Sequence, residues 1–126
     1  MDGAPEEPPL RLLLVSDHRA AGDALTAYLS RHGFIVVARA STPAAAAAAA
    51  GSSGIDVALI DGDVACGWRP VVAALADPLG RHRIAVLSSY WGQQERSDAT
   101  RCGIGAALLK RIAGSALAGQ LRALAA

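Results

Sequence analysis

The sequence has 126 residues, of which 52% are hydrophobic and 18% are charged, with a formal net charge of +1. This length and hydrophobic content predict one globular domain with a buried core. The nearly balanced charge provides no basic stripe of the kind that neutralises nucleic-acid phosphates, so we expect no direct contact with nucleic acid. No stretch reaches the roughly 20 apolar residues of a transmembrane helix, so we expect this segment not to contact a membrane.

Residues 1–9 differ in composition from the rest of the chain. They are rich in Pro and Glu and show neither the basic region nor the apolar run of a signal peptide. This composition predicts an interdomain linker, a folded domain over residues 10–126, and neighbouring domains in a longer chain. Cys66 and Cys102 lack the spacing of metal ligands, which favours a reduced protein in the cytoplasm.

The first half of the chain alternates strand and helix patterns. Residues 10–15 are an apolar run that predicts a strand, and residues 24–29 carry apolar side chains at helical spacing, with Gly33 as the expected C-cap. The β-branched run 34–38 predicts a second strand. Thr42-Pro43 supplies a helix N-cap with Pro at the first helical position, and the Ala-rich residues 44–50 continue that helix.

The second half repeats the alternation around a central apolar run. Residues 55–60 predict a strand buried on both faces, which delivers Asp61 to the edge of a sheet. The remaining patterns predict two strands and three helices. These are a short helix at 70–76, a strand at 83–87, a polar helix from Tyr90 to Cys102, a strand at 106–109, and a last helix capped by Ser115.

Five strands alternating with five helices predict an α/β fold with a five-stranded, parallel, doubly wound sheet of the flavodoxin-like kind. In such sheets, ligands bind outside the carboxyl ends of the strands. Polar residues follow four of the predicted strands, namely Asp17, Asp61, Ser88 and Lys110. The topology therefore brings these four residues to one rim.

These residues resemble the receiver domains of bacterial two-component systems, which occur in response regulators and hybrid histidine kinases. The resemblance runs from about Leu10 to the end of the chain and implies an acidic pair after the first strand, an Asp phosphoacceptor after the third, a Ser or Thr after the fourth and a Lys after the fifth. The matching positions are Ser16-Asp17, Asp61, Ser88-Ser89 and Lys110. The interval from Ser88 to Lys110 also fits the family.

The resemblance implies a role in signal transduction. A histidine kinase or phosphotransfer domain would donate a phosphoryl group to Asp61, with Ser88 and Lys110 binding the phosphoryl oxygens, and the domain would relay its state to a neighbouring domain. Mg²⁺ would be held by the carboxylates of Asp17 and Asp61 and by the backbone carbonyl of Asp63. The domain would not be an enzyme in its own right, and the resemblance leaves a homodimer open.

Four positions depart from the family pattern. Ser16 replaces one acidic residue, the loop 62–68 lacks the usual Met-Pro pair, Ala107 stands at the position of the switch aromatic residue, and Arg111 replaces the Pro after the Lys. These departures favour an alternative, a pseudo-receiver that acts without phosphorylation by binding a protein or a small ligand such as a cyclic dinucleotide. A third hypothesis, an enzyme on the same fold, lacks a nucleophile-base pair and a Gly-rich cofactor motif.

The aromatic pair after Ser88 leaves two interpretations open. Aromatic residues make up only 4% of the chain, so Tyr90 and Trp91 stand out as the bulky side chains of this loop. Trp91 is either part of the core or part of an exposed recognition patch beside the site. The three histidines, His18, His32 and His82, are predicted to be solvated.

Overall fold

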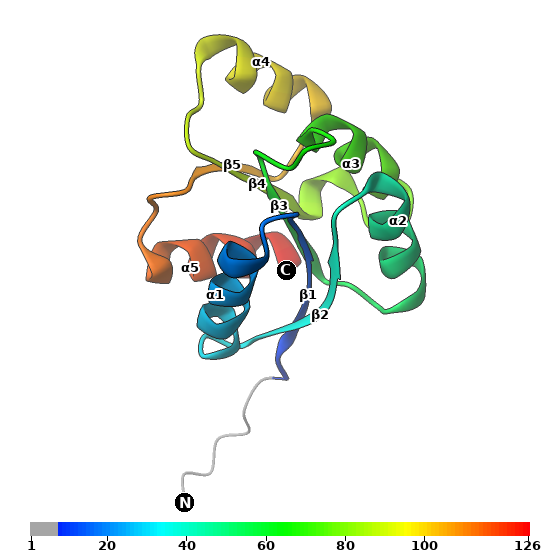
Figure 1. Cartoon of the computed structure of the whole chain (residues 1–126), viewed down its shortest axis with the longest axis vertical. Helices are drawn as coiled ribbons and strands as arrows, with labels where there is room; N and C mark the ends of the chain where they lie inside the picture. Colours follow the sequence, from blue (N-terminus) through cyan, green and yellow to red (C-terminus); the bar gives the residue numbers. More distant parts are fainter. Residues whose placement is uncertain (1–7) are drawn as a thin grey trace, which may run out of the picture.

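A computed structural model describes residues 8–126, and these residues form a three-layer α/β sandwich (Figure 1). Its five strands are all parallel and lie in the order β2-β1-β3-β4-β5. The strands are β1 (Leu10–Val15), β2 (Phe34–Ala40), β3 (Val57–Asp61), β4 (Ile84–Ser88) and β5 (Ala106–Leu109). The helices are α1 (Arg19–Ser30), α2 (Pro43–Ser52), α3 (Trp68–Leu75), α4 (Gln93–Cys102) and α5 (Gly114–Ala125). The predicted doubly wound fold is therefore confirmed.

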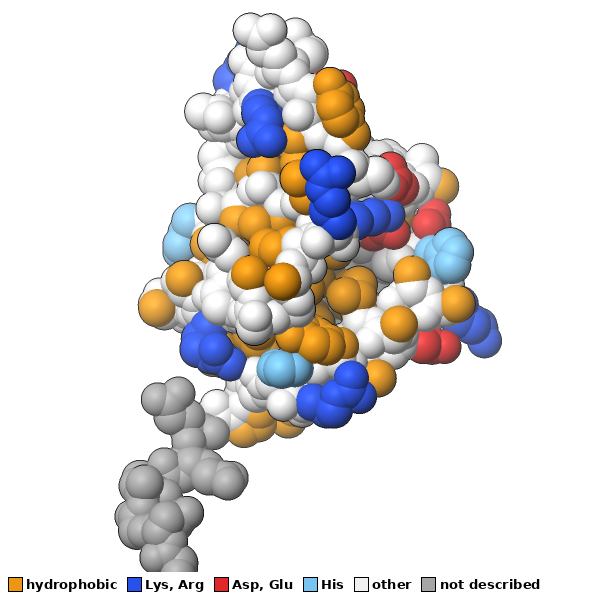
Figure 2. Space-filling model, turned by 90° about the vertical axis from the view of Figure 1, so that its left-hand side faces the viewer, with side chains coloured by type: hydrophobic (Ala, Val, Ile, Leu, Met, Phe, Trp, Pro, Cys, Tyr) orange, Lys and Arg blue, Asp and Glu red, His pale blue; other side chains and the backbone are white. Residues whose placement is uncertain are grey.

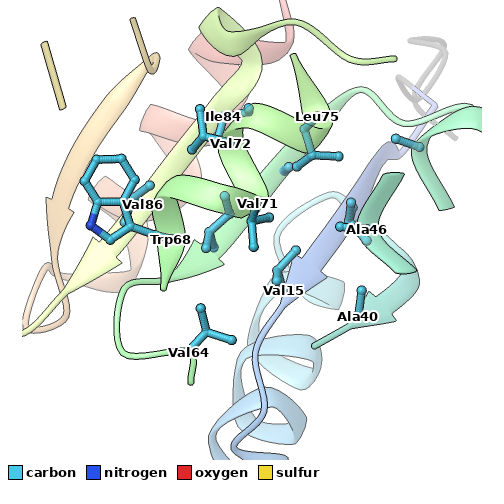
Figure 3. Packing of buried hydrophobic residues seen from close by; sticks show 14 of the residues in the cluster. Val15, Ala40, Ala46, Val64, Trp68, Val71, Val72, Leu75, Ile84 and Val86 are labelled. Atoms are coloured by element: carbon cyan, nitrogen blue, oxygen red, sulfur yellow. The ribbon is translucent and has the colours of Figure 1, made fainter. Parts of the chain in front are cut away.

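Two apolar clusters hold the helices against opposite faces of the sheet. On one face, Leu29 of α1 and Leu117 and Leu121 of α5 pack against Leu12, Leu14 and Leu59 of the strands. On the other face, α2 and α3 pack against β1 and β4, as Figure 3 shows for Ala46, Val71, Val72 and Leu75. Burial on both faces explains why the strands of the sheet centre read as continuous apolar runs in the sequence.

The centre of the sheet positions the functional rim. All five residues of β3 are buried, and this strand pairs with β1 on one side and with β4 on the other. Asp61 is its last residue and lies opposite Leu87 in the register of the β3–β4 pair. A rigid, doubly paired strand therefore fixes the backbone of Asp61.

Several predicted element boundaries move by a few residues. The β3 strand begins at Val57 instead of residue 55, and β2 runs on to Ala40. Helix α3 begins at Trp68 instead of residue 70. Pro70 is tolerated in this first turn because the first backbone N–H groups of a helix have no partner inside it. A short 3₁₀ turn, Arg81–Arg83, precedes β4.

Two of the predicted helix caps are wrong, and one is confirmed. Helix α1 ends at a C-cap Arg31, two residues before Gly33, although Gly33 does take a positive φ of 90°. Ala113, and not Ser115, precedes the first turn of α5, without a side-chain cap. The hydroxyl of Thr42 accepts a hydrogen bond from the backbone N–H of Ala45, as predicted, and Pro43 opens α2.

The aromatic residues of the β4–α4 loop divide between core and surface. Trp91 is buried, with its indole N–H donating to the carbonyl of Leu108 at 2.8 Å, whereas Tyr90 is 72% exposed. Of the two interpretations of Trp91, the core position is therefore correct. His18 and His82 are exposed as predicted, but His32 is half-buried and its ring stacks on Tyr28.

Within residues 8–126, no helix has both the length and the apolar character needed to cross a bilayer. On the face shown in Figure 2, Lys and Arg side chains lie in separate groups with apolar and neutral surface between them. The predicted linker, residues 1–9, lies mostly outside the described residues and stays a prediction.

Candidate functional site

Asp61 is the buried carboxylate of the rim. It is 9% exposed, and its Oδ1 accepts a hydrogen bond from the backbone N–H of Asp63 at 2.9 Å. The ammonium of Lys110 lies 2.9 Å from the same oxygen. A carboxylate buried to this degree requires a partner charge or hydrogen bonds, and Lys110 and the Asp63 amide supply both.

Lys110 bridges two carboxylates. Its Nζ lies 2.9 Å from Asp61 Oδ1 and 2.8 Å from Asp63 Oδ2. The backbone N–H of Lys110 donates to the carbonyl of Ser88 at 2.8 Å, which ties the end of β5 to the end of β4. The predicted meeting of residues from β3 and β5 at one rim is thus present in the structure.

These contacts shift two pKa values in opposite directions. The hydrogen bond from Lys110 lowers the pKa of Asp63, against a smaller opposing effect of burial. Burial acts to lower the pKa of Lys110, but its hydrogen bonds to Asp63 and Asp61 outweigh burial and raise it. Because the folded pKa of Asp63 is depressed, its ion pair favours the folded state above the unfolded pKa of Asp, and this contribution is lost as the pH falls through the folded value.

Gly62 allows the β3 and β4 ends to approach closely. Its backbone N–H donates to the carbonyl of Leu87 at 2.8 Å. A Cβ atom at this position would lie 2.9 Å from the Cβ of Ser88 and 3.2 Å from the carbonyl oxygen of Leu87. A side chain would therefore push apart the two strand ends that form the rim.

The two serines after β4 have different partners. The Ser88 hydroxyl donates to the carbonyl of Tyr90 at 3.1 Å and closes a local turn, whereas the Ser89 hydroxyl donates to Asp63 Oδ2 at 3.2 Å. Ser88 was the predicted phosphate-binding hydroxyl, and that role stays a prediction. Sequence reasoning did not assign a role to Ser89, although the Ser88-Ser89 pair was a signal that either hydroxyl could face the site.

Ser16 and Asp17 lie at the end of β1 beside Asp61. The hydroxyl of Ser16 is 3.4 Å from Asp61 Oδ2, and Asp17 Oδ2 accepts the backbone N–H of Ala65 at 2.8 Å. A polar hollow of about 430 Å³ opens next to them and gives solvent access to this side of the rim. Its lining residues are Ser16, Asp17, Arg19, Asp23, Arg39 and Ser41.

The oxygen atoms at this rim fit a hard cation, with one carboxylate fewer than the family pattern. In the described part of the chain, Asp17 Oδ1 receives no hydrogen bond, and Asp61 Oδ2 has only its long contact with Ser16. Mg²⁺ takes one or two protein carboxylates and keeps several waters, so this set is sufficient in type. Within residues 8–126, however, no three Asp, Glu, His or Cys side chains cluster as a metal site. The Mg²⁺ ligands Asp17, Asp61 and Asp63 thus stay a prediction.

Comparisons with known proteins find similarity in structure only. No protein-family model matches the sequence, and no curated protein matches it. Among solved structures, the signal receiver domain of NarL from Mycobacterium tuberculosis has a TM-score of 0.82 and 22% identity, over 94% of this chain and 98% of that chain.

The structures of two further neighbours contain additional groups. A response regulator from Burkholderia pseudomallei, with a phosphorylated aspartic acid, a calcium ion and citrate, has a TM-score of 0.79 and 22% identity, over 92% of this chain and 68% of that chain. The receiver domain of the sensor histidine kinase PA1611 from Pseudomonas aeruginosa, with a magnesium ion in its active-site cleft, has a TM-score of 0.78 and 21% identity, over 93% of this chain and 98% of that chain. The chain therefore has the fold of the receiver domains of two-component systems.

Proposed function

We propose that this chain is a signal receiver that accepts a phosphoryl group on Asp61 from a histidine kinase or a phosphotransfer domain. The observation that supports this proposal most directly is the buried carboxylate of Asp61 at the end of the central strand, with the Lys110 ammonium 2.9 Å away. The phosphorylated aspartic acid of the Burkholderia pseudomallei neighbour agrees with it.

The transfer needs a nucleophile and a fixed cationic group. The P–N bond of a phosphohistidine breaks with its electron pair left on the imidazole nitrogen, and a carboxylate oxygen of Asp61 forms the new P–O bond, which yields an acyl phosphate. Lys110 is held in position through its backbone bond to Ser88 and its ion pair with Asp61. Its charge stabilises the phosphoryl oxygens as they approach. A hydroxyl from Ser88 or Ser89 completes the oxygen contacts.

Asp17 and Asp61 would hold Mg²⁺ through their carboxylates, and Asp63 through its backbone carbonyl. A bound Mg²⁺ would offset the repulsion between the carboxylate of Asp61 and the phosphate dianion. The magnesium ion in the Pseudomonas aeruginosa neighbour supports this part of the proposal. With Ser16 in place of a second carboxylate beside Asp17, we infer that the site binds Mg²⁺ more weakly than one with a full acidic pair.

The proposed role defines the partners. The phosphoryl donor is a separate protein or domain, and the recipients of the signal are neighbouring domains of a longer chain in the cytoplasm. We infer no direct contact with nucleic acid or a membrane through this segment. The domain supplies electrostatics to the transfer and is not an enzyme with a substrate of its own.

Phosphorylation can be tested directly by intact mass. Incubation of the protein with Mg²⁺ and a small phosphodonor should add the mass of one phosphoryl group, and hydroxylamine, which cleaves acyl phosphates, should remove it. The same result is expected with a phosphorylated phosphotransfer domain. No gain in mass from any donor would reject the proposal and leave the phosphorylation-independent pseudo-receiver as the better interpretation.

A second carboxylate at position 16 should strengthen cation binding. Ser16→Asp adds a negative charge within a few Å of the proposed Mg²⁺, which is worth on the order of 1 kcal/mol even in a solvated site, so affinity should rise about fivefold or more. A Mg²⁺ titration followed by tryptophan fluorescence measures this change. The control is Ser97→Asp, which makes the same change in net charge at an exposed position of α4, a helix that carries none of the proposed Mg²⁺ ligands. Equal gains in the two variants would show that Ser16 does not face the cation.

A further inference from the structure

Asp63 makes the contacts that a phosphoryl group would make. Its Oδ2 accepts hydrogen bonds from Lys110 Nζ at 2.8 Å and from the Ser89 hydroxyl at 3.2 Å. These donors are the cation after β5 and a hydroxyl after β4, which the proposed function assigns to the phosphoryl oxygens. One anionic oxygen of the protein itself already occupies both.

We propose that the Asp63 carboxylate is an internal stand-in for the phosphoryl group. In the unmodified protein it holds the β4–α4 loop, residues 89–92, against the rim. A phosphoryl group on Asp61 then binds Lys110 and Ser89 and displaces the carboxylate of Asp63 from both. The first statement is independent of any phosphorylation, and the second rests on the proposed function.

The structure provides the anchors that this exchange requires. The backbone of Asp63 is fixed by the hydrogen bond that its N–H donates to Asp61 Oδ1 at 2.9 Å, while its side chain is 59% exposed. The carboxylate can therefore turn out to solvent by side-chain rotation, without movement of the strand. Asp63 is a positioning residue in this scheme, because it acts through Lys110 and Ser89.

Ser89 lies inside a turn that the Ser88 hydroxyl closes by donating to the carbonyl of Tyr90, and the next residue, Trp91, is anchored in the core by its bond to Leu108. The bond from Ser89 to Asp63 is a direct side-chain link between this loop and the β3–α3 loop. Loss of this link should therefore release mainly residues 89–92, which lie between the end of β4 at Ser88 and the start of α4 at Gln93.

Charge makes the arrangement sensitive to what enters the site. Two carboxylates, Asp61 and Asp63, share the single ammonium of Lys110, so these three groups carry one net negative charge. An incoming phosphate dianion meets repulsion from Asp63 until that side chain leaves. The same carboxylate thus holds the loop in place and opposes phosphorylation.

Amide hydrogen exchange of the unmodified protein tests the first statement. Without a phosphodonor, Asp63→Asn should raise the exchange rates of residues 89–92 about tenfold, the factor that corresponds to a lost charge-assisted hydrogen bond. Ser89→Ala should raise the same rates. Asp56→Asn, just before β3 and at the opposite end of that strand from Asp61, serves as the control. Unchanged exchange rates in Asp63→Asn would show that the Asp63 carboxylate does not hold this loop against the rim.

Phosphorylation of the same variant tests the second statement. After phosphorylation, confirmed by intact mass, Asp63→Asn should regain the slow exchange of residues 89–92, because the phosphoryl group now binds Lys110 and Ser89. If amide exchange in this loop stays fast in the phosphorylated variant, the phosphoryl group does not replace the Asp63 carboxylate at Lys110 and Ser89. Absence of a mass gain in the wild-type protein would instead reject the proposed function, while the result for the unmodified protein would still stand.

Discussion

Replacement of Asp61 by Asn is expected to abolish formation of the phosphoryl adduct and to leave the fold intact. The amide of Asn is not a nucleophile toward phosphorus at neutral pH, and Asp61 is the only carboxylate within β3. Asn has nearly the same shape as Asp, and its side-chain oxygen can still accept the backbone N–H of Asp63. Lys110 also keeps its second partner, Asp63 Oδ2, at 2.8 Å, so no unpaired buried charge is created.

Intact mass after incubation with Mg²⁺ and a small phosphodonor measures the effect, and circular dichroism reports on the fold. Asp56→Asn is the matched control, because Asp56 precedes β3 and its carboxylate accepts the backbone N–H of Arg11 at 2.8 Å, at the other end of the strand. The control should gain the mass of one phosphoryl group like the wild-type protein. A full mass gain in Asp61→Asn would assign the acceptor to another residue.

Much of the fold could be predicted from local patterns. The bounds of β1 and β5 match the predicted ones, and the central run ends in Asp61 as expected. The strands β1 and β3 were visible because parallel strands buried on both faces need apolar runs, which other elements of this length rarely show. The edge strand β5 has only Leu108 buried, and its short apolar run before Lys110 was the signal there. The start of α3 was less clear, since Pro70 marks the first turn of a helix without fixing which of its residues it occupies.

The site could be predicted only to the level of the rim. Topology alone brings Asp61 and Lys110 together, because both follow strands of one parallel sheet. Which of two adjacent serines faces the carboxylates depends on side-chain direction at the point where β4 ends. The ion pair of Asp63 with Lys110 spans 47 positions of sequence, and no local pattern encodes a contact of that kind.

The core position of Trp91 could not be predicted from the sequence either, since a large aromatic residue in a polar loop fits a surface patch or a core equally well. The structure shows why the core is preferred. The ring lies edge-to-face on Trp68 with centroids 6.0 Å apart, beside the small side chain of Ala107 in the same apolar cluster. Trp91 therefore occupies core volume next to Ala107, the position at which the receiver-domain pattern has its switch aromatic residue.

Trp91→Ala is accordingly expected to lower the free energy of unfolding by about 3–5 kcal/mol, the range for large-to-small substitutions of buried aromatic residues. The indole is only 6% exposed, so its removal leaves a cavity beneath the β4–α4 loop. It also removes the indole N–H donor to the carbonyl of Leu108, and an unsatisfied buried acceptor costs about 1–3 kcal/mol. Urea unfolding followed by circular dichroism measures the loss.

Two variants separate packing from hydrogen bonding. Trp91→Phe keeps most of the ring contacts with Trp68 but cannot donate to Leu108, so it should fall between wild-type and Trp91→Ala. Tyr90→Ala, next to it in the chain but 72% exposed, should change stability by less than about 0.5 kcal/mol. A loss in Trp91→Ala no larger than that in Tyr90→Ala would mean that Trp91 does not anchor the loop in the core. The position of Ser89 on the rim would then depend on the turn closed by Ser88 and on the bond to Asp63.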